Sequence, residues 1–99
     1  MARISYAFQA LSDLERISDF VVHAGHDALE VLDLIDEAIA ILPRHPFIGR
    51  RVEAGLRELV ISQGKTGYVA LYSVEAEYDA ILVLAIRHQL DAGWNVPLV

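Results

Sequence analysis

Hydrophobic residues change their spacing midway along the chain, and this change constrains the fold more than any other feature. Between residues 12 and 42, apolar side chains recur every three or four positions, the period of a helix with one buried face. Between residues 56 and 88 they form short apolar runs separated by turn residues, which is typical of strands. Helices followed by grouped strands predict an α+β domain, with an antiparallel sheet and a helical hairpin packed on one face.

A short strand is expected before the helices, because residues 3–9 alternate apolar and polar side chains. The apolar positions of this strand are Ile4, Tyr6 and Phe8. A capping box follows, in which the Ser12 hydroxyl accepts from the amide of Glu15 while the Glu15 carboxylate reaches back. This signature predicts that the first helix begins at Ser12.

The two helices are predicted from their apolar stripes and their end signals. Gly25 is expected to end the first helix, Asp27 with Glu30 to start the second, and Pro43 to stop it. The first stripe comprises Leu14, Ile17 and Val21, with Phe20 as a further member. The second comprises Ala28, Val31, Leu32, Ile35, Ala38, Ile39 and Leu42. A connection this short predicts an antiparallel hairpin.

Three strands are expected at residues 56–62, 68–74 and 80–88, joined by hairpin loops at 63–67 and 75–79. The predicted order is therefore βααβββ. If odd-numbered residues pair with odd-numbered residues in both hairpins, two apolar sets lie on opposite faces of the sheet. The odd set is Leu59, Ile61, Val69, Leu71, Ile81 and Val83, and the even set is Val60, Ala70, Tyr72, Leu82, Leu84 and Ile86. Since helices cover one face, the other should be partly open to a partner.

Composition indicates one compact domain over residues 1–99. Apolar residues make up 55% of the chain and charged residues 22%, which is unlike a disordered protein. No apolar run is long enough for a membrane helix, and the start of the chain lacks the pattern of a secretory signal. We therefore expect a cytoplasmic protein without membrane association. The chain has no cysteine, so it has neither disulfides nor thiolate metal sites.

Basic residues gather in one segment of an otherwise acidic chain. The net charge is −6, yet residues 44–65 hold five basic residues against two acidic ones. We call this segment the basic island; its cations are Arg44, Arg50, Arg51, Arg57 and Lys65. Such asymmetry favours an anionic or acidic partner, although a solvated loop edge would look the same.

Several segments together resemble the RelE/ParE toxins of bacterial type II toxin-antitoxin systems. The matching residues are Ile4 to Phe8, Leu11 to Leu14, Ile17, His45 to Arg50, Gly55 to Leu59, Tyr68 to Tyr72 and Val83 to Gln89. The resemblance covers about residues 3–94 and agrees with the βααβββ order. It implies one of two activities. RelE-like members are ribosome-dependent endoribonucleases that cut messenger RNA, whereas ParE-like members act on DNA gyrase.

Ribonuclease chemistry needs a base, an acid and convergent cations. The resemblance would lead one to expect an arginine on the strand 68–72 of a RelE-like enzyme, and this chain has Val69 and Ala70 there. The remaining candidates for catalysis are Arg57, Arg87 and His88. Strand alternation predicts that Arg87 and His88 point to opposite faces. Structural ion pairs with the adjacent Glu58 and the nearby Glu53 are the alternative role for Arg57.

We therefore interpret the chain as a ParE-like toxin that inhibits growth by acting on DNA gyrase. The resemblance implies a cognate antitoxin and a toxin-antitoxin hetero-oligomer. A disordered antitoxin segment is expected to fold against the open sheet face and the basic island. The contact residues predicted for it are Arg50, Arg51, Arg57 and Arg87.

Two alternatives stay open, namely a RelE-like endoribonuclease that acts on ribosome-bound mRNA, and an inactive homologue that survives as a binding partner. No cofactor is expected in any of these roles. The spacing of His23, His26 and His45 fits no metal site. Tyr68, Tyr72 and Trp94 are expected to be core or edge aromatics.

Overall fold

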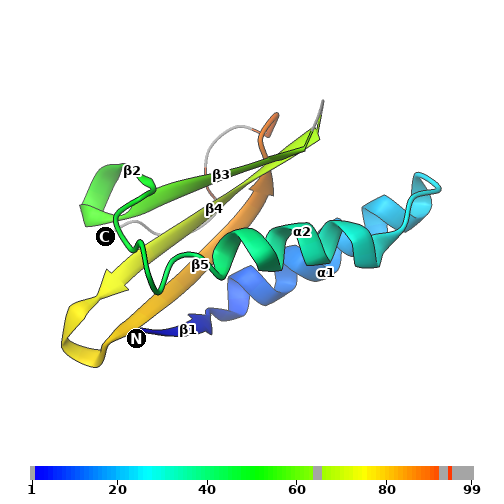
Figure 1. Cartoon of the computed structure of the whole chain (residues 1–99). Helices are drawn as coiled ribbons and strands as arrows, with labels where there is room; N and C mark the ends of the chain where they lie inside the picture. Colours follow the sequence, from blue (N-terminus) through cyan, green and yellow to red (C-terminus); the bar gives the residue numbers. More distant parts are fainter. Residues whose placement is uncertain (1, 64–65, 92–93, 95–99) are drawn as a thin grey trace.

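The structure, a computed structural model, describes residues 2–63, 66–91 and 94. Its elements follow the predicted order, with one short strand added after the helices (Figure 1). The helices and strands are β1 (Arg3–Tyr6), α1 (Phe8–His23), α2 (Ala28–Ile39), β2 (Arg50–Arg51), β3 (Arg57–Gln63), β4 (Thr66–Glu75) and β5 (Ala80–His88). Short 3-10 turns at Glu53–Gly55 and Ala76–Tyr78 connect β2 to β3 and β4 to β5.

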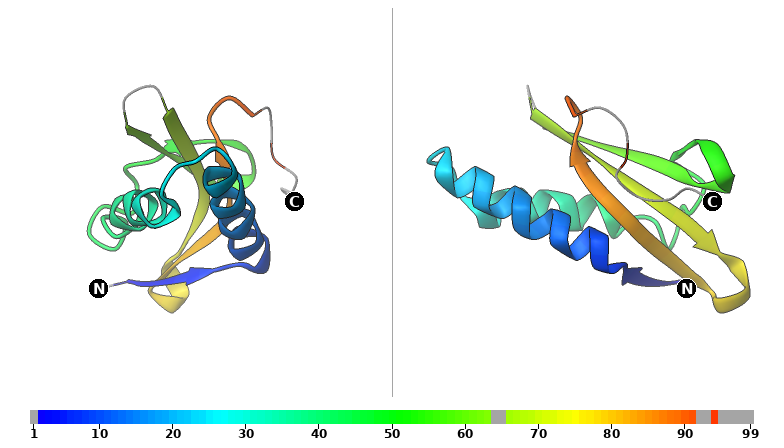
Figure 2. Two further views of the ribbon diagram at one scale, coloured as in Figure 1. Left: turned by 90° about the vertical axis from the view of Figure 1, so that its right-hand side faces the viewer. Right: turned by 180° about the vertical axis from the view of Figure 1, so that it is seen from behind.

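The strands form one sheet in the order β1-β5-β4-β3-β2. β1 pairs with β5 in parallel, whereas β5, β4, β3 and β2 pair with their neighbours in antiparallel fashion. The right-hand view of Figure 2 shows α1 and α2 side by side along the sheet, with their turn projecting beyond it. The α+β class with a helical hairpin on one face is therefore confirmed, and the parallel edge strand makes the sheet mixed.

The first helix begins earlier than the capping box predicted. Its N-cap is Ala7, which offers no side-chain hydrogen bond, and the helix already includes Ser12. The prediction was wrong because Asp13, the residue next to the expected cap, is buried inside the helix contact with β5. The end at Gly25 is confirmed. Gly25 has a φ of +82°, and the amide of His26 donates to the carbonyl of Val21 at 2.9 Å.

The second helix begins where its sequence signals predict, but it ends at Ile39, short of the predicted stop at Pro43. The Asp27 carboxylate accepts a 2.9 Å hydrogen bond from the amide of Leu29, as expected for an N-cap. Ile35, Ile39 and Leu42 are fully buried, and the rest of the predicted stripe is half-buried. In α1, by contrast, Phe20 is exposed and is not part of the stripe.

The strand register differs from the register assumed from the sequence. Gln63 pairs with Thr66, so two residues connect β3 to β4. As a result, odd-numbered residues of β3 lie opposite even-numbered residues of β4. A bulge between Leu71 and Tyr72 shifts the β4–β5 register as well. Each predicted set is therefore split between the faces. The helix-side face carries Leu59, Ile61, Tyr68, Ala70, Tyr72, Ile81, Val83 and Ile86.

The second face of the sheet is apolar, as predicted, but only partly open. Val69, Leu71 and Ala85 on this face are buried, whereas Val60 is 58% exposed. The indole of Trp94 bonds to Glu58 on the same face. Within the described residues, neither helix has the length and apolar character needed to cross a membrane.

Candidate partner-binding surface

Residues 45–49 form a loop between α2 and β2 that the Tyr72 hydroxyl fixes in place; we call it the pinned loop. The amide of Gly49 donates to the Tyr72 hydroxyl at 2.9 Å, and the hydroxyl donates to the carbonyl of Pro46 at 2.8 Å. Burial raises the pKa of Tyr72, against opposing effects of the Gly49 hydrogen bond and the Arg57 charge. The phenol therefore stays protonated and keeps its role as a donor.

Gly49 is required where the pinned loop crosses the sheet. A Cβ at this position would lie 2.6 Å from the Tyr72 hydroxyl and 2.7 Å from the carbonyl oxygen of Glu58. The second of these atoms belongs to the backbone and cannot move aside cheaply. Glycine thus permits the contact that holds the loop against β3 and β4.

Arg57 holds the same loop from the start of β3. Its Nη1 donates to the carbonyl of Gly49 at 2.8 Å and to that of Phe47 at 3.1 Å. The guanidinium also lies 5.0 Å from the centre of the Phe47 ring, which is a cation–π distance. Arg51 is the partner of Arg57 across the β2–β3 ladder. Glu58, the carboxylate suggested for an ion pair with Arg57, pairs with Arg50 instead.

Glu58 is a buried carboxylate that joins β2 to Trp94. It forms an ion pair with Arg50 and accepts a 2.8 Å hydrogen bond from the Trp94 indole. Burial acts to raise the pKa of Glu58, but the hydrogen bonds from Arg50 and Trp94, with the charges of Arg50 and Arg87, outweigh it. The pKa of Glu58 is therefore lowered.

Arg87 lies on the second face of the sheet, beneath the same indole. Its guanidinium is 4.6 Å from the Trp94 ring centre, and its Nη1 donates to the carbonyls of His88 and Asp91. Its Nε is buried and has no hydrogen-bond partner in the described part of the chain. The contacts with Trp94 and the two carbonyls hold this side chain against the protein.

His88 lies on the helix-side face, as strand alternation predicted. Its ring packs edge-on against Tyr68, with ring centroids 5.5 Å apart, and its Nδ1 accepts from the amide of Leu90. Both side chains line a cavity of about 520 Å³. The other lining residues are Arg16, Ile17, Phe20, Leu90 and Asp91. His88 is therefore separated by the sheet from Arg87.

The structure does not bring the three candidate catalytic residues together. Arg57 binds loop carbonyls at one end of β3, while Arg87 and His88 face opposite sides of β5. Val69 and Ala70, which stand where a RelE-like arginine was expected, are both buried. Among the residues described, no three His, Asp or Glu side chains are grouped as metal ligands.

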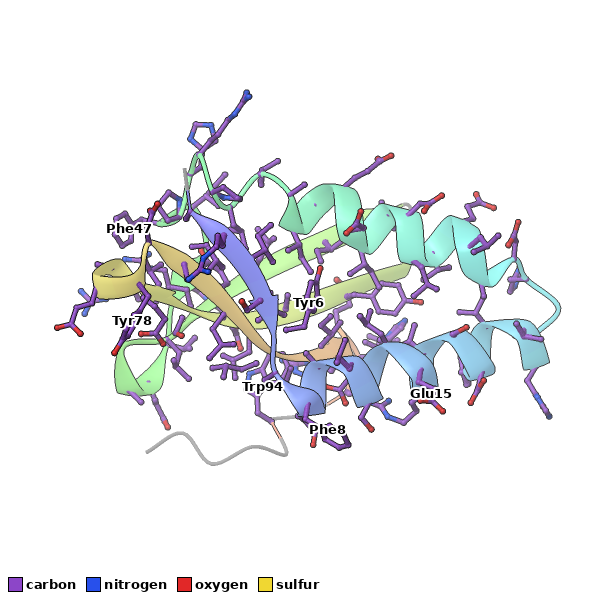
Figure 3. All side chains as sticks on the ribbon, turned by 90° about the horizontal axis from the view of Figure 1, so that it is seen from below. Tyr6, Phe8, Glu15, Phe47, Tyr78 and Trp94 are labelled. Carbon is purple, nitrogen blue, oxygen red and sulfur yellow. The ribbon has the colours of Figure 1, made fainter. Side chains whose placement is uncertain are left out.

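The four predicted contact arginines fall into two groups. Arg50 and Arg51 are exposed on β2, whereas Arg57 and Arg87 are half-buried and engaged with backbone carbonyls and aromatic rings. Lys65 of the basic island lies outside the described residues. Figure 3 shows Phe47 at the end of the molecule opposite the α1–α2 turn.

Sequence reasoning missed the exposed pair Phe47 and Ile48 and the role of Tyr72. Phe47 is 64% exposed and Ile48 is 57% exposed, although both sit in a loop with a fixed backbone. A local signal for the exposed pair was present in the sequence. Two large apolar residues between Pro46 and Gly49 belong to no predicted helix or strand, so no buried face is expected to cover them. The link to Tyr72, 23 residues from Gly49, had no signal in a single sequence.

A sequence model of the family described as "ParE toxin of type II toxin-antitoxin system, parDE" matches residues 4–93. The chain belongs to this family of ParE toxins. Toxin RelE3 of Caulobacter vibrioides is 32% identical over 92 residues, which cover 92% of this chain and 98% of that toxin. The RelE/ParE superfamily assignment is confirmed.

Solved structures agree with the ParE family fold. A chain of the chromosomal ParDE toxin-antitoxin system from P. aeruginosa superposes with a TM-score of 0.73 at 25% identity, covering 89% of this chain and 96% of that one. A chain of the intact E. coli RelBE toxin-antitoxin complex gives a TM-score of 0.66 at 13% identity. The superposition covers 93% of this chain and 100% of that one. The second likeness concerns the fold alone.

Proposed function

We propose that this ParE family member inhibits growth through protein contact, with DNA gyrase as its target, and that it has no nuclease activity of its own. The observation that carries the proposal is the separation of Arg57, Arg87 and His88. Cleavage of RNA needs an acid, a base and cations around one phosphate. Here the sheet stands between Arg87 and His88, and Arg57 is held by the pinned loop.

The charge of the chain supports the same proposal. A toxin that docks on the ribosome approaches dense phosphate, where cationic surface supplies most of the affinity. This chain has a net charge of −6. Two arginines of the basic island, Arg50 and Arg57, are also engaged within the protein by Glu58 and by loop carbonyls. These two charges are therefore less available to phosphate.

We further infer a cognate antitoxin that binds the toxin in a hetero-oligomer. The ParDE structure with the same fold comes from a toxin-antitoxin system, which supports this partner. The exposed arginines of β2, Arg50 and Arg51, are the predicted contacts that remain accessible to it. Action on gyrase and neutralisation by such an antitoxin would both take place in the cytoplasm.

Induced expression in growing bacteria without antitoxin tests the target. We expect growth to stop with gyrase-linked DNA breakage and with intact ribosome-bound transcripts, in the unaltered chain and in His88→Ala alike. Rapid transcript cleavage that disappears in His88→Ala would establish the endoribonuclease instead. Normal growth at full expression would identify an inactive homologue and would contradict both active roles.

A further inference from the structure

The pinned loop presents two large apolar side chains to solvent. Phe47 and Ile48 are 64% and 57% exposed and adjacent in sequence. Single exposed apolar residues are common on protein surfaces and need no explanation. An adjacent pair on a loop held by four hydrogen bonds is less easily dismissed, because these bonds prevent the pair from turning inward.

The rigidity of this loop is useful for binding. Ordering a flexible loop on association costs free energy, and a loop fixed beforehand avoids that cost. Tyr72 is fully buried where it holds Gly49 and Pro46, and Arg57 braces the Phe47 ring and carbonyl. Aromatic side chains with fixed positions are typical binding hot spots. Phe47 meets this description.

The charge around the pair indicates the chemistry of the partner. Arg44, Arg50 and Arg51 are exposed on either side of the pinned loop, in a chain whose overall charge is negative. Arginines beside an apolar pair are complementary to a partner surface on which carboxylates surround an apolar socket. The surface thus selects for an acidic protein.

The shape of the surface argues for a folded partner. Phe47 and Ile48 project from the loop, so they need a preformed socket, which a folded protein has and a disordered segment lacks. A disordered segment suits a concave surface, such as the groove of about 510 Å³ between α1 and α2. That groove has Leu14 and Leu32 in its lining, together with Glu15, Asp33 and Asp36. Its acidic lining favours a partner of opposite charge to the one that fits the loop.

We propose that the pinned loop is the docking element for the toxin's cellular target, with Phe47 and Ile48 inserted into an apolar socket flanked by carboxylates. This inference rests on the proposed function, since it takes that target to be DNA gyrase. Arg57 and Tyr72 act as positioning residues, because they hold the loop and leave the contact to its tip.

Binding of the full-length chain to DNA gyrase holoenzyme, measured by biolayer interferometry, tests the inference. The double variant Phe47→Ser, Ile48→Ser should weaken binding by roughly 30-fold or more, as expected for a hot spot. Leu29→Ser is the matched control, since Leu29 is 69% exposed on α2 and remote from the loop, and it should bind like the unaltered chain. Thermal unfolding of both variants checks that they remain folded.

Two further measurements separate positioning from contact. Tyr72→Phe keeps both contact side chains but releases the loop, so it should weaken binding by about 3- to 10-fold. Affinity of the unaltered chain should fall as salt rises from about 50 to 300 mM, because the charges at the rim are screened. If the unaltered chain does not bind gyrase, the proposed function fails, and this inference with it. Unchanged gyrase binding by the folded double variant would overturn the inference alone.

Discussion

Asp13 is a buried carboxylate that joins α1 to strand β5. It accepts hydrogen bonds from Gln9, from Arg16 and from the backbone amide of Ile86, each at 2.8–2.9 Å. β1 pairs with β5 only as far as Val83, so Asp13 satisfies an amide beyond the end of that ladder.

Replacing Asp13 tests this role at the scale of one residue. Asp13→Ala should lower the free energy of unfolding by about 1–3 kcal/mol, because the buried amide of Ile86 loses its acceptor. Urea denaturation measures this value. Asp19→Ala, at an exposed position of the same helix, is the control and should change stability by less than about 0.5 kcal/mol. Equal stability of the two variants would contradict the role assigned to Asp13.

Glu58 makes stability depend on pH in the acid range. Its pKa is lower in the folded chain than in the unfolded chain, so its ion pair with Arg50 and its bond to Trp94 stabilise the fold above the unfolded pKa of about 4.3. That contribution is lost as pH falls through the folded pKa. Glu58→Gln should therefore be less stable than the unaltered chain at neutral pH, by about 1–2 kcal/mol.

The difference should narrow as the pH falls from the unfolded pKa through the lowered folded pKa of Glu58, below which both chains carry a neutral group at this position. Thermal unfolding midpoints measured across this range give the comparison. The control is Glu77→Gln, which removes a carboxylate at an exposed position. A stability gap for Glu58→Gln that stays constant with pH would rule out the ion pair as its cause.

The pinned loop is the element whose backbone the Tyr72 hydroxyl holds in place. Tyr72→Phe removes the hydroxyl that bonds Gly49 and Pro46, so the loop should open while the sheet stays intact. We expect a loss of about 1–2 kcal/mol and faster hydrogen exchange at the Gly49 amide. Tyr78→Phe, at a 67% exposed tyrosine, should leave this amide protected. Unchanged protection in Tyr72→Phe would show that the hydroxyl does not hold the loop.

Elements with a strong local signal were predictable from the sequence. Both helices follow from their apolar spacing and from Asp27 and Gly25, whose capping interactions involve neighbours a few residues away. The residues on each sheet face were not predictable from the sequence. Which residues share a face depends on the two-residue connection between β3 and β4 and on the bulge between Leu71 and Tyr72. The two-residue strand β2 is too short to show any period.

The sequence located the basic segment of the candidate surface, but not the contacts that its individual arginines make. The charge pattern located the basic island, since charge is read directly from the sequence. It did not separate the exposed Arg51 from Arg57, whose guanidinium binds the loop carbonyls. That difference depends on contacts between segments brought together by folding. The burial of Val69 and Ala70 likewise required the sheet register.

For the molecule as a whole, we propose that this ParE family chain acts by binding. Its two helices and sheet hold a preformed loop at one end, and the three candidate catalytic side chains are kept apart. An enzyme would need those side chains to converge. A binding protein needs only a rigid and accessible surface.

The most direct test is DNA supercoiling by purified gyrase in the presence of the purified chain. We expect inhibition of supercoiling with accumulation of cleaved DNA, equally with the unaltered chain and with His88→Ala. In parallel, mRNA on programmed ribosomes should stay intact at the same toxin concentration. Undisturbed supercoiling together with cut ribosome-bound mRNA would contradict action on gyrase and would identify this chain as a nuclease.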